Sequence, residues 1–417
     1  MKSMLVFVTA VVVLIALPIG AGGASSDWPQ WHSPNRDGHS PDVGLLKQWP
    51  AGGPTLVWKA SGLGAGYTSV SVVGDRLFAM GEKGDANFAI ALNRADGKTL
   101  WTTHVGKAGA PGWGSFAGPR ATPTVDGDLV FAVGQYGEVA CLDAATGKEH
   151  WRKSLVDDFG GTVPHWGYAG MPLVDGDNVI LMPGGRRGDL VALRKATGEL
   201  VWQSKDLTDG IHYSSPIVEV IGGVRQYIQL TDASVAGIAA ADGRLLWRAP
   251  RKGKTAVIPT PIYHDGCVYV TSGYGIGCNL FKISVDGDKF SATEVYANKV
   301  LTNHHGGVIR VGEYLYGFSE GKGWTCQDFA TGKAMWQDKK LGKGSLVYAD
   351  GMLYLRAESG KGTIALIEAT PEGYREKGRF DQPNRSEQNS WPHPIVIGGR
   401  LYIRDQDVLL CYDVQAK

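Results

Sequence analysis

The sequence predicts an all-β protein, an eight-bladed β-propeller in which each blade is a sheet of four antiparallel strands. Three observations lead to this prediction. A unit of four short strands recurs along the chain, a tight turn closes each unit, and a tryptophan follows that turn at a nearly constant position. Successive tryptophans from Trp101 to Trp247 are 50, 51 and 45 residues apart. A four-stranded repeat of about 40–50 residues is typical of a propeller blade.

The repeating unit is clearest between Thr122 and Trp151. Its expected strands are 122–125, 129–133, 138–142 and 149–155, and the turns between them are 126–128, 134–137 and 143–148. The first turn contains an Asp-Gly pair, which favours a hairpin because glycine adopts positive φ without steric cost. The 59 glycines of the chain suit a fold with many such turns.

The closing turn and the tryptophan keep the same phase in five repeats. The turns are Asp96-Gly97-Lys98, Thr146-Gly147-Lys148, Thr197-Gly198-Glu199, Asp242-Gly243-Arg244 and Thr331-Gly332-Lys333, followed by Trp101, Trp151, Trp202, Trp247 and Trp336. A large flat side chain at a fixed phase fills the wedge between neighbouring blades, where it buries about 150–250 Å². These tryptophans are therefore expected in the core. Another position of the repeat is occupied only by small residues, which predicts a small buried side chain there. These residues are Ala91, Cys141, Ala192, Cys326 and Cys411.

The two ends of the chain are expected to share one blade. Residues 394–397, 401–403 and 408–414 supply three strands, and the chain stops at Lys417 without a fourth. Residues 55–60, which contain Trp58, form a strand with no blade of its own. Pairing of this strand with the last blade closes the ring and removes an open sheet edge. The count is then eight blades, with seven as the alternative if the fifth or seventh blade is irregular.

The N-terminal residues predict export. Lys2 precedes an apolar run from Met4 to Ile19, and small residues follow up to Ala24, as in a signal peptide. The run is short for a membrane anchor. The expected divisions are a signal peptide at 1–24, an N-terminal arm at 25–54 pinned by Trp28 and Trp31, and a propeller at 55–417. The expected location is periplasmic or extracellular, with no membrane insertion after cleavage.

Charge and cysteine content narrow the function classes. Lysine and arginine number 42 against 41 acidic residues, so the net charge is +1 and nothing favours nucleic acid as a partner. The five cysteines are an odd number, and Cys267 and Cys278 look out of register for pairing on one hairpin. The sequence predicts buried free thiols, no disulfides and a monomer.

The residues that lead into the first strand of each blade define a candidate site. In a propeller the first strand is innermost, so these residues surround the axis on one face. They are rich in aromatic rings and include five of the ten histidines. Such a funnel suits a planar cofactor, a sugar or a peptide segment, and an arginine in it can pair with a carboxylate. The alternative is a channel of polar residues that satisfy one another through water. The candidate ligand-binding residues are Tyr67, Arg120, Trp166, Tyr168, His212, Tyr213, His304, His305, Trp391 and His393.

A metal site is not expected at this position. His304 and His305 are adjacent, and on an extended segment they point to opposite faces, so only one would face the axis. The residues leading into the first strands also include no aspartate or glutamate. Acids would have to come from neighbouring loops, at Asp232, Glu320, Asp405 or Asp407.

The D-x-x-TGK turn followed by tryptophan resembles the PQQ-like (pyrroloquinoline quinone) propeller repeat over nearly all of the mature chain. From Trp28-Pro29-Gln30-Trp31 to the segment 405–413, the sequence looks like the exported single-domain members of that family. The resemblance implies an eight-bladed ring. The family that it resembles has two branches. Quinoprotein alcohol dehydrogenases hold the quinone and calcium on the axis, and BamB-like proteins are non-catalytic platforms in outer-membrane protein assembly.

This chain departs from both branches. It lacks the adjacent cysteine pair that stacks on the quinone in alcohol dehydrogenases, and it has no C-x-x-C-H haem motif. The lipid anchor of a BamB protein requires a cysteine after the apolar run, and this sequence has none there. The resulting interpretation is a non-catalytic binding or assembly module with no cofactor and no catalytic residue, whose partner is a protein, a small molecule or a carbohydrate. The alternatives are a quinone-dependent alcohol or sugar dehydrogenase with PQQ and calcium, and a carbohydrate-binding propeller.

Overall fold

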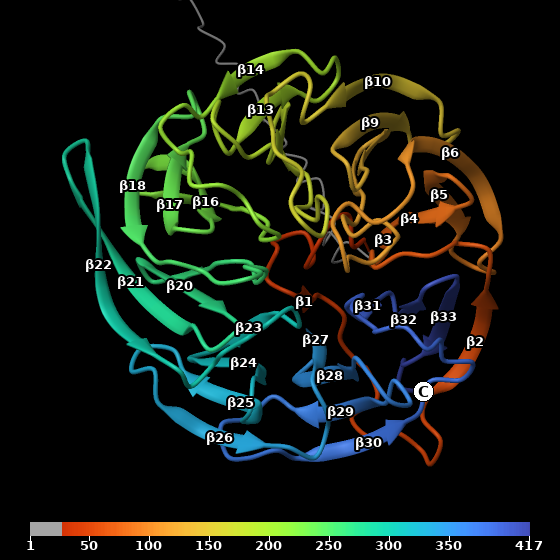
Figure 1. The fold of residues 1–417 in the computed structure, drawn as a ribbon. Coiled ribbons are helices and arrows are strands. Elements are labelled where there is room, and N and C mark those ends of the chain that lie inside the picture. Colours follow the sequence, from red (N-terminus) through yellow and green to blue (C-terminus); the bar gives the residue numbers. More distant parts are fainter. Residues whose placement is uncertain (1–26) are drawn as a thin grey trace, which may run out of the picture.

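The computed structural model describes residues 27–417, so the predicted signal peptide at 1–24 lies outside the described residues. The described chain forms eight sheets arranged as blades around a central axis (Figure 1). The eight-bladed prediction is confirmed, and the seven-bladed alternative is wrong.

Seven blades are each built from four consecutive antiparallel strands, in which the first strand is innermost. Blades 1 to 4 are β3–β6 (Ser71–Val73, Arg76–Lys83, Ala86–Asn93, Thr99–Lys107), β7–β10 (Thr124–Asp126, Leu129–Val133, Glu138–Asp143, Glu149–Ser154), β11–β14 (Leu173–Asp175, Asn178–Leu181, Val191–Arg194, Leu200–Gln203) and β15–β18 (Ile217–Ile221, Val224–Leu230, Ser234–Ala239, Leu245–Pro250). Blades 5 to 7 are β19–β22 (Ile262–His264, Cys267–Ser272, Gly277–Asp286, Lys289–Asn298), β23–β26 (Val308–Val311, Tyr314–Ser319, Gly323–Asp328, Ala334–Asp338) and β27–β30 (Gly344–Ala349, Met352–Ala357, Ile364–Glu368, Glu376–Phe380).

Blade 8 is the composite that the sequence predicts. Its inner strands are β31 (Ile395–Ile397), β32 (Arg400–Asp405) and β33 (Val408–Asp413), and its outer strand is β2 (Thr55–Ala60) from the other end of the chain. β2 pairs antiparallel with β33, so that Trp58 faces Cys411. The ring is therefore closed by hydrogen bonds between the two ends of the propeller, which leaves no unpaired edge at the closure.

The predicted wedge tryptophans join one blade to the next. In blade 2 the Trp151 indole lies against Gly198 of the closing turn of blade 3, and its Nε1 donates to the carbonyl of Lys195 at 2.9 Å. Trp58, Trp101, Trp202 and Trp336 likewise donate to a backbone carbonyl of the next blade, at 2.8–3.2 Å. Each contact both buries an indole ring and satisfies its polar atom, which explains why turn and tryptophan recur together.

The strand register explains the phase that holds a small residue. Cys141, Ala192 and Cys326 are the direct cross-strand partners of Trp151, Trp202 and Trp336. A larger side chain at this position would meet the indole. All five cysteines are free thiols, and Cys267 pairs across the hairpin with Lys282 rather than Cys278.

Blade 5 departs from the repeat because β21 and β22 form a hairpin of ten-residue strands, which projects from the ring in Figure 1. This blade therefore offers no closing turn to the preceding tryptophan. Trp247 donates instead to Gln226 Oε1 of its own blade at 2.6 Å. On the other side Tyr296 replaces tryptophan, and its hydroxyl donates to the Phe329 carbonyl of blade 6 at 2.8 Å.

The N-terminal arm runs across the end of the ring and reaches the axis. Trp28 bridges to Val72 of blade 1, and β1 (His39–Ser40) pairs in parallel with β27 of blade 7. Between these points the arm is held by Arg36, which is buried and donates to Gln30 and to the carbonyls of Pro172 and Pro216. No helix within residues 27–417 has the length and apolar character needed to cross a membrane.

Candidate functional site

A cavity of about 300 Å³ lies on the propeller axis. Most of its lining comes from the segments that precede the first strands of the blades, which is where the sequence places the candidate funnel. Blade 7 contributes none of these residues, while Trp31 comes from the arm and Tyr274 from the turn between β20 and β21. The lining residues are Trp31, Tyr67, Phe116, Arg120, Trp166, Ala169, Met171, Tyr213, Ala256, Ile258, Tyr274, His304, His305, Trp391 and His393.

Eight of the ten candidate residues line this cavity, and Tyr168 and His212 do not. Tyr168 is buried in the core against Gly137, and its hydroxyl donates to the Pro183 carbonyl at 2.8 Å. His212 accepts the backbone N–H of Val257 at Nδ1, and its Nε2 lies 3.5 Å from Asp232. Tyr168 is therefore part of the core, and His212 lines a separate hollow beside His165.

Aromatic rings form two walls of the cavity. On one side Trp391 lies 4.5 Å from Tyr67 and 5.0 Å from Phe116, measured between ring centroids, and it meets Phe116 edge to face. On the other side Trp166 packs edge to face on Tyr213 at 5.8 Å. Flat apolar walls of this kind suit a planar group, because a ring can stack on them over its whole face.

Arg120 is the cation of the cavity. Its guanidinium lies 5.3 Å from the Tyr67 ring centroid, in cation–π range. Two of its nitrogens donate to the backbone carbonyls of Gly118 and Phe116, at 3.0 and 2.9 Å. Burial lowers the pKa of Arg120 to about 10, so the side chain stays charged at neutral pH.

Two histidines form the polar wall. The segment around His304 is a bend rather than an extended strand, so the expectation that only one of the pair faces the axis is wrong: both line the cavity, with centroids 4.9 Å apart. His304 contacts the Tyr274 hydroxyl at 2.8 Å and accepts a hydrogen bond from Lys343 at 2.6 Å. His305 Nε2 donates to Glu358.

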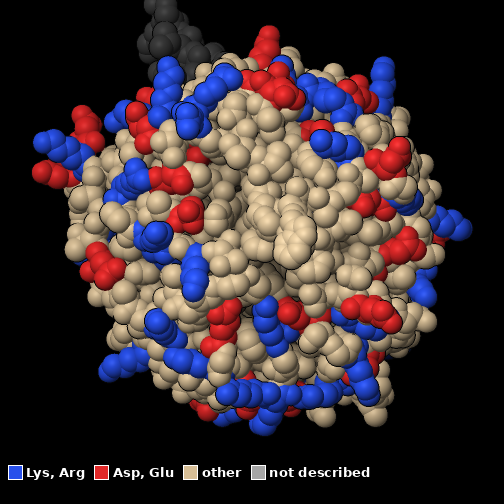
Figure 2. Space-filling model, viewed as in Figure 1, with Lys and Arg blue, Asp and Glu red and all other residues tan. Residues whose placement is uncertain are grey.

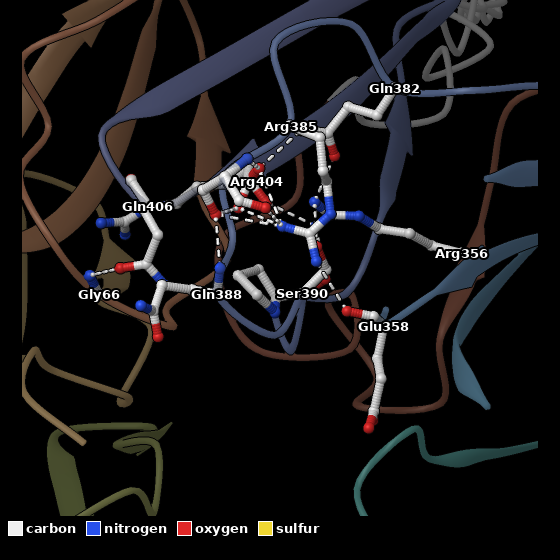
Figure 3. Close-up of polar contacts among 12 residues, drawn as sticks. Gly66, Arg356, Glu358, Gln382, Arg385, Gln388, Ser390, Arg404 and Gln406 are labelled. Atoms are coloured by element: carbon white, nitrogen blue, oxygen red, sulfur yellow. Dashed lines mark hydrogen bonds and ion pairs between the residues drawn. The ribbon is translucent and has the colours of Figure 1, made fainter. Parts of the chain in front are cut away.

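Glu358 supports this wall from behind. Burial alone would raise its pKa, but the hydrogen bond from His305 and the charge of Lys343 outweigh burial and hold the pKa at about 2. Figure 3 shows that the Glu358 backbone carbonyl faces Arg385, from which it accepts a hydrogen bond at 2.8 Å. The Glu358 side chain points away from Arg385. The carboxylate is therefore free to orient His305.

The arm closes the floor of the cavity. Trp31 donates to Thr260 Oγ1 at 3.1 Å and stacks on His32, with centroids 4.2 Å apart. His32 Nε2 lies 3.1 Å from His393 Nδ1, and His393 Nε2 donates to the His305 carbonyl at 3.0 Å. This chain of contacts fixes the tautomer of His393 and links the arm to the histidine wall. Of the two tryptophans expected to pin the arm, Trp28 is core packing and Trp31 is part of the cavity.

A calcium shell would need the loop acids Asp232, Glu320, Asp405 and Asp407, and none of them lines the cavity. Asp405 accepts hydrogen bonds from Ser386, Gln382 and Arg385, the last two of which are labelled in Figure 3. Asp407 accepts the backbone N–H groups of Gly62 and Gly64. Within residues 27–417 no group of three or more His, Cys, Asp or Glu side chains is placed to hold a metal ion.

A loop beside the cavity carries Trp113, the most exposed of the large apolar residues in the described chain. Glu82 Oε2 accepts the N–H groups of Gly109 and Gly118 at 3.0 and 3.1 Å and so ties the two ends of this loop together. Phe116 turns into the cavity, while Trp113 is 96% exposed. In Figure 2 the charged side chains lie mostly around the outer part of the disc and the centre of this face is largely uncharged.

Sequence reasoning missed Trp31, Phe116, Tyr274 and the small apolar lining residues. Phe116 lies only four residues before Arg120, so reading further upstream of the first strand would have found it. Nothing in the repeat pattern places Trp31 or Tyr274, because the arm lies outside the repeats and Tyr274 belongs to a turn between two later strands.

Fold and site together define a propeller with an aromatic, largely apolar cavity on its axis. Residues 86–338 match the family described as outer membrane protein assembly factor BamB. The chain belongs to this family of PQQ-like propellers.

Individual relatives are distant. The outer membrane protein assembly factor BamB of Moranella endobia (strain PCIT) is 25% identical over 282 residues, covering 63% of this chain and 68% of the relative. The crystal structure of BamB from Moraxella catarrhalis superimposes with a TM-score of 0.63 at 16% identity, over 87% of this chain and 98% of that one. Quinohemoprotein alcohol dehydrogenase from Comamonas testosteroni gives 0.67 at 12% identity, over 95% and 82%. These structural likenesses show the fold.

Proposed function

We propose that this chain is an exported, non-catalytic binding or assembly module whose partner engages the axial cavity. The observation that carries the proposal is the make-up of the cavity wall: aromatic rings and histidines surround one arginine, and no carboxylate is among the described lining residues. Family membership supports a protein partner in the cell envelope, since relatives are described as outer membrane protein assembly factors. The apolar run at residues 4–19 supports export.

The wall does not fit a quinone with calcium. Calcium takes six to eight oxygen ligands, chiefly carboxylates and carbonyls. The lining offers Tyr67, Tyr213 and Tyr274 hydroxyls but no aspartate, glutamate, asparagine or glutamine side chain. No carboxylate is present among the described lining residues to act as a general base for alcohol oxidation.

A carbohydrate fits less well than a flat aromatic group. A sugar ring presents several hydroxyls, each of which needs a hydrogen-bond partner when it is buried. Most of the lining is ring carbon or aliphatic side chain. An aromatic ligand, or an aromatic side chain of a protein partner, matches that surface better.

Titration of the purified protein with small probes tests this function. Tryptophan fluorescence and calorimetry would follow 2-acetylnaphthalene and 6-hydroxy-2-naphthoate as planar aromatics, cellotetraose as a sugar, and pyrroloquinoline quinone with calcium chloride. We expect saturable one-site binding of a naphthalene, weakened at least about tenfold by Trp391→Ala. Trp113→Ala, a matched loss of an exposed indole outside the lining, should leave the affinity unchanged.

Three results would contradict the proposal. If neither naphthalene bound, an aromatic ligand of the cavity would be ruled out. Saturable binding of the oligosaccharide alone would favour a carbohydrate-binding propeller. Stoichiometric binding of the quinone with calcium, followed by dye-linked oxidation of alcohols, would make the chain a quinone-dependent dehydrogenase.

A further inference from the structure

We propose that the axial cavity selects a planar aromatic monocarboxylic acid, whose carboxylate pairs with Arg120 and whose ring carries a hydroxyl that donates to His305 Nδ1. This inference rests on the proposed function, because it names the chemical class of ligand for the same cavity. Three features lead to it: a guanidinium with unused donors, walls of flat rings, and a buried nitrogen without a partner.

Arg120, which is only partly buried, differs from the arginines that are fully buried. Arg36, Arg251, Arg356 and Arg404 each donate at least three hydrogen bonds, to backbone carbonyls or neutral side chains. Arg120 donates two, both to its own loop, although a guanidinium has five N–H groups. Arg120 is also the only one of these five that lines the cavity. Its spare donors are therefore at a surface that a ligand can reach.

The charge of Arg120 has no carboxylate partner. Among residues 27–417 no ion pair within 4.0 Å includes this side chain. The nearby Glu82 is committed to the backbone N–H groups of Gly109 and Gly118 and to Gln135. A partly desolvated cation without a counterion is costly, so a ligand carboxylate that forms paired hydrogen bonds with it supplies the missing charge.

The rest of the cavity sets the size and shape of the acid. Arg120 lies over Tyr67, Tyr67 contacts Trp391, and Trp391 lies 5.8 Å from His305, so ring surfaces connect the cation to the histidine wall. A volume of about 300 Å³ is at the small end of ligand pockets and accepts one or two fused rings. With one unpaired cation, the cavity matches one carboxylate rather than several.

His305 defines the group at the far end of the ligand. Its side chain is buried, and its Nδ1 has no hydrogen-bond partner. Because Nε2 carries the proton that is donated to Glu358, Nδ1 of the neutral ring is an acceptor. Trp391 Nε1 is also buried without a partner. The two rings, 5.8 Å apart between centroids, thus offer an unpaired acceptor and an unpaired donor, and a ligand hydroxyl that donates to His305 Nδ1 supplies the first with a partner.

Matched naphthalenes on the unaltered protein test the carboxylate. We expect 6-hydroxy-2-naphthoate to bind about 10- to 100-fold more tightly than its methyl ester, the usual range for charge-assisted hydrogen bonds. The 6-methoxy acid, which cannot donate to His305, should bind about 3- to 10-fold more weakly than the hydroxy acid. Calorimetry gives all three constants without any variant.

Arg120→Met adds a test on the protein side, because methionine keeps the apolar stem and removes the charge. The variant should bind acid and ester equally, while Lys333→Met, which removes an exposed charge remote from the axis, should keep the preference. If ester and acid bind the unaltered protein equally, the ligand site stands and the inference is overturned. If neither binds, the axial ligand site itself is wrong. A preference that persists in a folded Arg120→Met variant would assign the carboxylate to another group and also overturn the inference.

Discussion

Tryptophan has two different roles in the blade wedges and in the axial cavity. The wedge indole of Trp151 lies on a turn glycine of the next blade and its Nε1 is satisfied by a backbone carbonyl. The axial indole of Trp391 contacts other rings, is only partly buried and has an Nε1 without a partner. The difference shows that composition alone does not assign a role. A wedge tryptophan completes the fold, whereas an axial one leaves binding capacity unused.

Truncation of one indole in each region should give the largest contrast. Trp151→Ala removes the side chain of a residue that is 8% exposed, and we expect it to lower the free energy of unfolding by about 3–5 kcal/mol. Trp166→Ala removes a half-buried ring at the cavity and should cost no more than about 1 kcal/mol. Urea unfolding of both variants measures the difference. Equal destabilisation would mean that the axial rings are structural packing.

Acidification should weaken the axial region through its histidines. Burial lowers the pKa of His304 to about 3, with help from the neighbouring His305 ring and the charge of Lys343, and burial lowers the pKa of His393 to about 3 as well. Below about pH 6.5 the unfolded chain binds protons that the folded chain refuses, so stability falls until the pH reaches about 3. Between pH 7.5 and pH 5 each histidine should cost about 1–2 kcal/mol.

Urea unfolding of His304→Gln at these two pH values checks the assignment. The variant should lose less stability on acidification than the unaltered protein does, by about 1–2 kcal/mol. His150→Gln, at an exposed position on β10, serves as the matched control and should show the full pH dependence. An unchanged pH dependence in His304→Gln would mean that acid acts elsewhere in the propeller.

The sequence predicts the wedge region more completely than the site. Turn, tryptophan and small cross-strand partner are local signals that repeat, so the blades, their number and the closure by residues 55–60 follow from the printed sequence. The cavity depends on side-chain direction at single positions. Tyr168 follows Gly167, whose φ of +80° turns the chain and sends the tyrosine into the core.

The other departures at the axis have similar causes. A bend brings His304 and His305 to the same side, although an extended segment would separate them. Trp31 reaches the axis from the arm, through contacts with residues more than 200 positions away. Neither feature is encoded in the repeat, and so the repeat phase identifies where the cavity lies but only part of what lines it.

The turn glycines give the sharpest test of the wedge. Gly198 has φ of +72°, and a Cβ there would lie 2.8 Å from the Trp151 ring; Gly127 has φ of +57° with no atom within 4 Å of such a Cβ. Both alanine variants carry the cost of positive φ, about 1 kcal/mol, but only Gly198→Ala also displaces an indole. We expect Gly198→Ala to be less stable than Gly127→Ala by about 1–3 kcal/mol, the usual cost of overpacking. Thermal and urea unfolding of the pair measure this difference.

In a Trp151→Ala background the extra cost should disappear, because the ring is gone. If the two glycine variants were equally stable in the native background, Gly198 would be needed only for its positive φ. The indole–glycine contact would then not be what joins the blades.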